Sequence, residues 1–364
     1  MTLALHEFHK GLNGRFAEVN DCEVVADYGD WLAEHAALRE SAGVLDLSFR
    51  SRLCLTGTDR ARWLNGQVTN NVKDLRAGQS CYAALVNAKG KLQSDLNIYC
   101  LPDELLLDFE PGLTASVAQR LEKYIIADDV QVVDVAQQYG LLSVQGSKAA
   151  EVVQRLGLFQ DVPAEAMHFT SIKDATLGEL YLMNQPRVGT KGFDFFVPTP
   201  ALGAVMDKLI AAAREVGGRA CGWTALETAR IEAGIPRFGA DMDESNLAPE
   251  TGIESRAISY NKGCYIGQEV IARIRTYGQV ARSLRGLRLA DELKHLPKKG
   301  DKLFHNGKEV GFINSAVKSP SLKANIALGY VRKESNQPGT HLSLRTADGE
   351  SAVEIVSTPF VRFC

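Results

Sequence analysis

The pattern of apolar residues changes near Arg282, and this change limits the folds that the chain can adopt. Before it, strand-like alternation takes turns with stretches of helical period, such as the face formed by Val117, Leu121 and Ile125. Beyond it, short apolar runs are separated by Gly, Pro and Asn, which is typical of a small β-barrel. We therefore predict an α+β fold with antiparallel and mixed sheets, helices and a C-terminal barrel, rather than a doubly wound sheet.

The length of 364 residues exceeds what one hydrophobic core usually organises, so we expect two or three domains. Apolar residues make up 45% and charged residues 23% of the chain, which allows a well-buried core. The opening residues carry acidic and imidazole groups and lack the apolar stretch of a secretory signal. No apolar run approaches the roughly 20 residues that span a bilayer. We expect a soluble cytoplasmic protein without a membrane partner.

The seven cysteines are scattered along the chain, and no two of them form a CxxC pair. A disulfide framework needs a small secreted context, and a zinc site needs clustered ligands, so both are disfavoured. We expect reduced thiols and no bound metal ion. The cysteines are Cys22, Cys54, Cys81, Cys100, Cys221, Cys264 and Cys364.

Charge is unevenly distributed, although the net charge is only −3. From Arg256 onward, 18 Lys and Arg stand against 9 Asp and Glu, whereas the preceding part has 23 against 35. This asymmetry suits an anionic partner for the C-terminal part, and it suits a solvated basic face equally well.

The segment with the most chemical content runs Lys262-Gly263-Cys264-Tyr265-Ile266-Gly267-Gln268-Glu269. Its two glycines indicate backbone that turns sharply or approaches another group closely. A helix that begins at Gln268 would place Cys264 just before a helix N-terminus and beside Lys262, where the field favours the thiolate. The thiol is then a candidate nucleophile, redox group or transient metal ligand. The alternative is a small packed apolar side chain.

This octapeptide, K-G-C-Y-x-G-Q-E, resembles the signature of the YgfZ family, which is related to the T-protein of glycine cleavage. Other parts of the chain are similar to segments of one or both families. They are residues 43–48 (GVLDLS), 65–70 (NGQVTN), 87–91 (NAKGK), 231–236 (IEAGIP) and 241–244 (DMDE).

The resemblance implies a ring of three domains around a central hole that binds tetrahydrofolate or a one-carbon derivative. Domain 1 would comprise residues 1–52 and 141–222, and domain 2 residues 53–140 and 223–282. Residues 283–364 would form the barrel domain. YgfZ-type proteins support the assembly or repair of iron–sulfur clusters, so the implied partners are folate and iron–sulfur client or assembly proteins. The implied working residues are Cys264 and its neighbour Lys262.

The related T-protein transfers an aminomethyl group, and the chain differs from it at three functional positions. Ser94 aligns with the first aspartate of the D-D-L-I-V strand, which we take as the catalytic carboxylate. Thr190 replaces a pteridine-binding glutamate, and Leu226 replaces an arginine. A serine cannot supply the negative charge of a carboxylate. We therefore expect negligible aminomethyltransferase activity.

The resemblance also suggests which side chains contact the folate. Asp95 and Glu232 are weighed equally as pocket groups and as ordinary polar residues, and Tyr265 could stack on an aromatic ring or pack in the core. Arg273 would suit a glutamate tail. The expected folate-binding residues are Asn87, Asp95, Glu110, Glu232, Tyr265, Gln268 and Arg273.

Three functions thus compete. The first is a tetrahydrofolate-binding factor for iron–sulfur clusters, and the second is a folate-dependent aminomethyltransferase or other one-carbon transferase. The third is a module without folate that uses the basic C-terminal part on RNA or another anionic partner. No recognised nucleic-acid motif occurs, so we expect no nucleic-acid partner.

Overall fold

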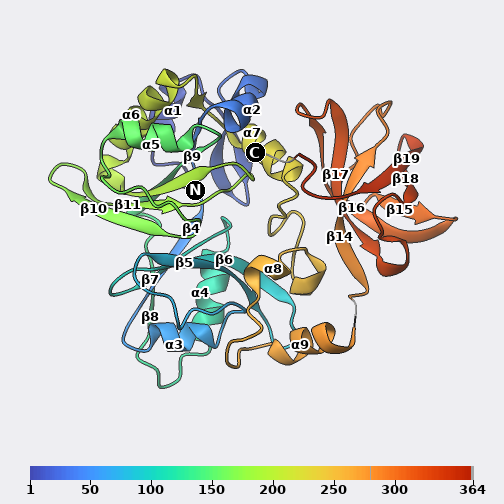
Figure 1. Cartoon of the computed structure of the whole chain (residues 1–364), viewed down its shortest axis with the longest axis horizontal. Helices are drawn as coiled ribbons and strands as arrows, with labels where there is room; N and C mark the ends of the chain where they lie inside the picture. Colours follow the sequence, from blue (N-terminus) through green and yellow to red (C-terminus); the bar gives the residue numbers. More distant parts are fainter. Residues whose placement is uncertain (279, 362–364) are drawn as a thin grey trace.

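The chain folds around three large sheets, which Figure 1 shows at the upper left, the lower left and the right, and it also forms a small two-stranded sheet of β1 (Arg15–Val19) and β2 (Cys22–Asp27). The computed structural model describes residues 1–278 and 280–361. Two of the sheets are covered by helices, and the third is a closed barrel. This arrangement confirms the predicted α+β class with its C-terminal barrel. The domain limits given above remain a prediction.

The first sheet has six strands in the order β10-β11-β12-β9-β3-β13, antiparallel except for the pair β13 and β3. Its strands are β3 (Gly43–Asp46), β9 (Tyr139–Gln145), β10 (Phe169–Asp174), β11 (Gly178–Asn184), β12 (Gly192–Pro198) and β13 (Arg219–Ala220). The surrounding elements are α1 (His6–Gly11), β1 (Arg15–Val19), β2 (Cys22–Asp27), α2 (Trp31–Glu40), α5 (Ala149–Leu156), a 3-10 helix η1 (Thr199–Ala201), α6 (Leu202–Glu215) and α7 (Trp223–Glu232).

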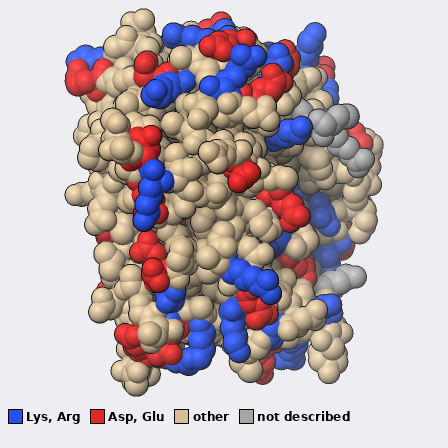
Figure 2. Space-filling view, turned by 60° about the vertical axis from the view of Figure 1, so that its left-hand side comes forward, with Lys and Arg blue, Asp and Glu red and all other residues tan. Residues whose placement is uncertain are grey.

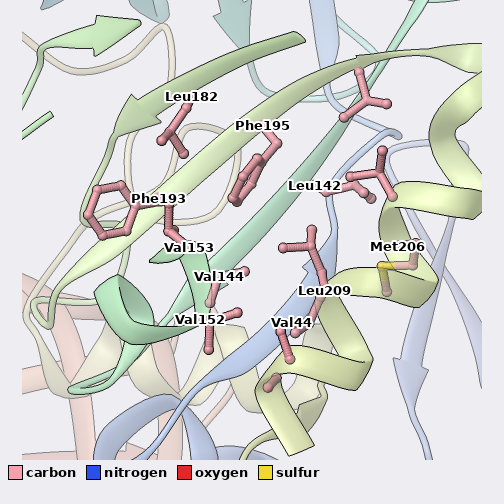
Figure 3. Packing of buried hydrophobic residues seen from close by; sticks show 14 of the residues in the cluster. Val44, Leu142, Val144, Val152, Val153, Leu182, Phe193, Phe195, Met206 and Leu209 are labelled. Carbon is pink, nitrogen blue, oxygen red and sulfur yellow. The ribbon is translucent and has the colours of Figure 1, made fainter. Parts of the chain in front are cut away.

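Alternation along β9 separates the two cores of this unit. Leu142 and Val144 point to the side covered by α5 and α6, where they pack with residues such as Phe195 and Leu209 (Figure 3). Leu141 points to the opposite side and packs in the cluster that includes Leu38 of α2. Both faces of the sheet are therefore buried, as the period-two side-chain pattern of a strand allows.

The second sheet has five strands in the order β5-β6-β7-β4-β8, all paired antiparallel. Its strands are β4 (Ser51–Thr56), β5 (Gln79–Val86), β6 (Leu92–Cys100), β7 (Leu105–Phe109) and β8 (Gln131–Asp134). The helices of this unit are α3 (Arg60–Asn65), α4 (Thr114–Glu122), η2 (Ala248–Glu250), α8 (Glu254–Ala257) and α9 (Gln268–Tyr277). Leu85 packs on one face of β5, whereas Ala84 and Val86 pack on the other.

The barrel closes in the order β14-β17-β16-β15-β18-β19. Its elements are β14 (Arg282–Leu289), β15 (Lys302–His305), β16 (Lys308–Ser319), β17 (Ala324–Arg332), η3 (Lys333–Ser335), β18 (His341–Thr346) and β19 (Gly349–Val356). Its interior is filled by aliphatic side chains, among them Leu287, Ile313 and Ile355, all fully buried. No helix within the described residues is long and apolar enough to cross a membrane.

The first two sheets meet at their edges. The Ser80 amide at the start of β5 donates to the Met167 carbonyl at 2.8 Å, and the Phe169 amide donates to the Gly78 carbonyl at 2.8 Å. The Ser80 hydroxyl also donates to the Met167 carbonyl, at 2.6 Å. The start of the β5 edge is therefore occupied by the segment that leads into β10, and residues 68 and 69 pair with the same edge farther along.

Glu232 connects the first sheet unit to the barrel. Its carboxylate accepts hydrogen bonds from His35 Nε2 at 2.9 Å and Arg39 Nη2 at 2.8 Å, both on α2. From the barrel side, the hydroxyls of Ser319 and Ser321 also donate to it. Its side chain is fully buried. Burial alone would raise the pKa, but the bonds from His35 and Ser319 and the charge of Arg39 lower it to about 2.

We expect Glu232→Gln to lower the free energy of unfolding at pH 7 by about 3–5 kcal/mol, because a buried ionic network loses its carboxylate. The depressed pKa means that this contribution is complete above the ordinary value of 4.5 and is lost as the pH falls towards about 2. The difference between the two proteins in urea unfolding should therefore shrink across that window. Glu309→Gln, in an exposed pair with Lys302, is the control and should change stability by less than about 1 kcal/mol. If Glu232→Gln changes the free energy of unfolding only slightly, or by the same amount at every pH, Glu232 is not an ionised member of this network.

Candidate functional site

A cavity of about 620 Å³ lies between the first two sheets and α7. Strands β5 and β6, the segment 185–189 between β11 and β12, and residues 235–237 after α7 all contribute side chains to its wall. No barrel strand lines it within the part of the chain that the structure describes. Its size lies in the range of about 300–1,000 Å³ that is usual for small-molecule sites. The cavity is therefore the first candidate for a binding site.

Two arginines and one aspartate hold the cavity wall together. Asp108 on β7 is fully buried and accepts hydrogen bonds from Arg50 Nε at 2.7 Å and Arg187 Nη2 at 3.0 Å. Burial opposes ionisation of Asp108, but the two guanidinium groups outweigh it and lower its pKa to about 2. Because Arg187 belongs to the first sheet unit and Asp108 to the second, this ion pair joins the two units.

Glu110, a predicted folate contact, lies at the cavity and is already paired on both sides. Arg50 Nη1 donates to it at 2.7 Å and Arg237 Nη1 at 3.1 Å. Its carboxylate is therefore engaged in neutralising the two arginines.

Asp95 is the carboxylate that remains available in the cavity. The Tyr82 hydroxyl donates to its Oδ2 at 2.8 Å, whereas the buried Oδ1 has no hydrogen-bond partner among the described residues. Burial, followed by the charge of Glu110, raises the pKa of Asp95 to about 6. A carboxyl group with this environment can take up or release a proton near neutral pH.

The structure corrects our interpretation of Ser94. Adjacent strand residues point to opposite faces, so Ser94 points away from the cavity when Asp95 lines it. The Ser94 side chain is fully buried, and its hydroxyl donates to the Asp95 carbonyl at 3.2 Å. A serine at this position does not deprive the cavity of a carboxylate. The argument against aminomethyl transfer that rested on Ser94 is therefore lost.

We expect Asp95→Asn to raise the free energy of unfolding at pH 7.5 by about 1–3 kcal/mol, because it removes a poorly solvated charge. The sign follows from the raised pKa: the folded state holds the proton more tightly, so wild-type stability falls as the pH rises from 3.8 to about 6. Urea unfolding should show a smaller difference in stability between Asp95→Asn and the wild type at pH 4 than at pH 7.5. Glu110→Gln, which breaks two ion pairs, should destabilise the protein at pH 7.5. Destabilisation by Asp95→Asn at that pH would contradict the raised pKa.

Five other expected folate contacts lie away from the cavity lining. Glu232 forms the buried network described above, and Tyr265 packs in the hydrophobic cluster beneath β5 and α8. Asn87 closes the β5–β6 turn by accepting hydrogen bonds from the Lys89 and Lys91 amides. The remaining two, Gln268 and Arg273, are on α9 and do not line the cavity.

The other two positions at which the chain differs from the T-protein, Thr190 and Leu226, also lie near the cavity. Leu226 of α7 lines it, next to Glu227. Thr190 is buried, its hydroxyl donates to the Leu38 carbonyl at 3.4 Å, and its neighbour Gly189 lines the cavity. An apolar side chain at position 226 therefore gives this part of the wall no charge.

Cys264 is exposed, which disagrees with the alternative of a small packed side chain, and α9 begins at Gln268 as predicted. The thiol does not face the cavity, however, since Cys264 is absent from the lining. The six described cysteines are all free, and Cys364 lies outside the described residues. Among the residues that the structure describes, no three His, Cys, Asp or Glu side chains gather as they would for a metal ion.

Lys262 is not directed at the thiol but at the backbone. Its Nζ donates to the carbonyls of Asn65, Val68 and Asn70 at 2.6, 2.8 and 2.6 Å. Burial lowers its pKa to about 8. Its ammonium also lies 5.1 Å from the centre of the Tyr265 ring. Lys262 therefore anchors one end of the loop that carries Cys264.

Gly267 anchors the other end of this loop. Its φ of +83° is unfavourable for other residues, and an added Cβ would lie 2.5 Å from the Asn87 carbonyl oxygen. Gly263 is the opposite case, because a Cβ there would meet nothing within 4 Å. Cys264 is thus exposed between a tightly docked glycine and a lysine with all its donors bonded.

We expect Gly267→Ala to lower the free energy of unfolding by at least about 1–3 kcal/mol, the usual cost of a strained backbone. Gly263→Ala, in the same loop, is the matched control and should stay within about 0.5 kcal/mol of wild type. Denaturant titration of both variants measures the two effects. Equal effects of the two substitutions would rule out the close docking of Gly267.

Several cavity residues were not found from the sequence, among them Arg50, Arg187 and Tyr82. The arginines reach Asp108 from distant parts of the chain, so no local pattern signals them. Tyr82 did have a signal. The β5–β6 pairing sets Ala84 opposite Asp95, which places Tyr82 on the same face, one diagonal step away.

On the face that Figure 2 shows, the charge asymmetry of the sequence does not appear as one field. Figure 2 shows basic and acidic side chains interspersed over the face in view. The excess of Lys and Arg after Arg256 therefore gives no broad basic patch on that face.

The fold is that of an α+β protein with an attached barrel, and its cavity is a candidate binding site. Residues 5–262 match the GCVT N-terminal domain, and residues 282–362 match the glycine cleavage T-protein C-terminal barrel domain. The chain therefore belongs to the glycine-cleavage T-protein family. Residues 263–281, which include Cys264, lie between the two matches.

Proteins similar to this chain extend over nearly its whole length. An aminomethyltransferase of Halalkalibacterium halodurans is 28% identical, covering 93% of this chain and 94% of that protein. An aminomethyltransferase of Mycobacterium avium is also 28% identical, covering 98% and 96%. The crystal structure of glycine cleavage system aminomethyltransferase T from Bartonella henselae matches with a TM-score of 0.89 at 24% identity, covering 100% of this chain and 98% of that chain. The last likeness shows the fold.

Proposed function

We propose that the protein binds tetrahydrofolate, or a one-carbon derivative of it, in the cavity between the first two sheets. The observation that carries this proposal is the buried Asp95 Oδ1, an acceptor without a partner among the described residues, in a cavity of about 620 Å³. A pterin ring presents N–H donors that such an oxygen can accept, and an unpaired buried acceptor is costly until it is bonded. Membership of the T-protein family supports the same ligand.

The cavity also suits the remaining parts of a folate. Phe49, Tyr82 and Trp223 supply aromatic surface for flat rings. Arg256 lines the cavity with its guanidinium 5.1 Å from the centre of the Tyr82 ring, and arginine matches the carboxylates of a glutamate tail.

For the cellular role, we propose support of iron–sulfur cluster assembly or repair, with iron–sulfur client or assembly proteins as partners. The octapeptide of the YgfZ type and the exposed thiol of Cys264 support this role. The cysteine lies outside both matched domains, and the T-protein positions at Thr190 and Leu226 are changed. An exposed cysteine side chain can act as a nucleophile, a redox group or a transient metal ligand.

Folate-dependent aminomethyl transfer is the second candidate, and Asp95 is the observation that favours it. A carboxylate in the cavity can stabilise positive charge that develops on a folate nitrogen, or accept its proton. The similar proteins that carry a named activity are aminomethyltransferases, which supports this candidate more directly than the first. Both candidates require a bound folate.

We expect calorimetry to show saturable binding of tetrahydrofolate, and Asp95→Ala to weaken it by about 10-fold or more, the worth of a hydrogen bond to a charged group. Ser94→Ala is the matched control, because the Ser94 side chain points away from the cavity, and this variant should bind as wild type does. Absence of folate binding to the wild-type protein would refute the proposal.

Two assays then separate the candidate roles. If the first role is correct, the Cys264→Ala protein should retain its folate affinity. Cells in which this variant replaces the wild-type protein should lose iron–sulfur enzyme activity. Turnover of an aminomethylated lipoyl carrier with tetrahydrofolate by the wild-type protein would establish the second role instead.

A further inference from the structure

Residues 65–70, here called the shared strip, contact the cavity on one side and the loop of Cys264 on the other. The backbone of the strip receives the three hydrogen bonds from Lys262 Nζ described above. An ammonium group has three N–H donors, so all of them are used. The position of this side chain is thereby fixed by the strip.

Further bonds hold the chain around the cysteine to the same strip. The Ile266 amide donates to the Gly66 carbonyl at 3.1 Å, and the Ser259 amide donates to the Thr69 carbonyl at 3.0 Å. The Thr69 hydroxyl donates to the Ala257 carbonyl at 2.6 Å. Residues 257–266 are therefore bonded to the strip at several points.

On its other side, the strip forms part of the cavity wall through Asn70. The Asn70 amide group donates to the Tyr82 carbonyl at 2.8 Å and the Arg256 carbonyl at 3.0 Å. Asn70, Tyr82 and Arg256 all line the cavity, and the Tyr82 hydroxyl binds Asp95. A continuous set of hydrogen bonds thus leads from the cavity carboxylate to Lys262, two residues before Cys264.

We propose that Lys262 is a positioning residue that couples occupation of the cavity to the reactivity of Cys264. The inference rests on the proposed function, because the occupant is a reduced folate. A ligand packed against Tyr82 and Asn70 restricts the strip, and the strip restricts the ammonium and the cysteine loop. Linkage between binding equilibria is reciprocal, so a covalent change at the loop that alters the strip should also alter folate affinity.

The test measures the rate at which iodoacetamide alkylates Cys264, followed by mass spectrometry of its peptide, with and without saturating tetrahydrofolate. We expect folate to slow alkylation of the wild-type protein about fivefold or more, in the usual range of coupling between sites. Lys262→Met should bring this ratio close to one. Lys148→Met is the matched control, a lysine that donates to the Val216 carbonyl in the first sheet unit, and it should keep the wild-type ratio. A wild-type ratio of one despite folate binding would overturn the inference.

A second measurement needs no folate and separates this inference from the proposed function. The rate of Cys264 alkylation is measured for the wild-type protein, Lys262→Met, Asn70→Ala and the double variant. These four rates form a double-mutant cycle. If the rate change in the double variant differs from the product of the two single changes, the two residues are coupled through the strip. If it equals that product, the inference is overturned, whether or not folate binds.

If Lys262→Met does not fold, hydrogen exchange of the wild-type protein tests the coupling instead. Folate should slow exchange of the Ser259 and Ile266 amides, whose acceptors belong to the strip. Unchanged exchange with bound folate would overturn the inference.

Discussion

The salt bridge of Asp108 with Arg50 and Arg187 is the interaction on which the cavity depends. It lies where two independent sheet units meet, and it removes three charges from water together. Each arginine also pairs with a second buried carboxylate, Arg50 with Glu110 and Arg187 with Asp194, so the loss of Asp108 would disturb a connected network of buried charges. The arrangement uses the arginines for structure while leaving their surroundings polar, so the cavity wall can be rigid and still suit a charged ligand.

The sequence was most informative where a local rule decides the outcome. The helix start at Gln268 followed from one segment, and the barrel followed from short strands separated by turns. The chemistry of Asp95 was harder to predict. Whether Asp95 or Ser94 faces the cavity depends on strand parity, and a shift of one residue exchanges the two faces.

Contacts between distant segments could not be predicted from local pattern. Glu232 and Tyr265 carry groups that suit a folate site, but tertiary packing commits the first to a buried network and the second to a core. Arg187 has no motif around it and acquires its role only when the first sheet unit meets Asp108. The family resemblance predicted the fold. The direction in which each side chain points could be learned only from the structure.

The meeting of the first two sheets at their edges has a consequence for the behaviour of the chain in a crowded solution. An open strand edge is a template for pairing with other molecules. Residues 68–70 of the same unit cover the later part of the β5 edge, but the first residues of β5 would present an open edge if the unit stood alone. The segment 167–169 occupies that edge, and the C-terminal strands close on themselves. A fluctuation that parted the two sheets would therefore open the cavity and expose an adhesive edge at the same moment, so protection of the site and resistance to aggregation are one property of this architecture.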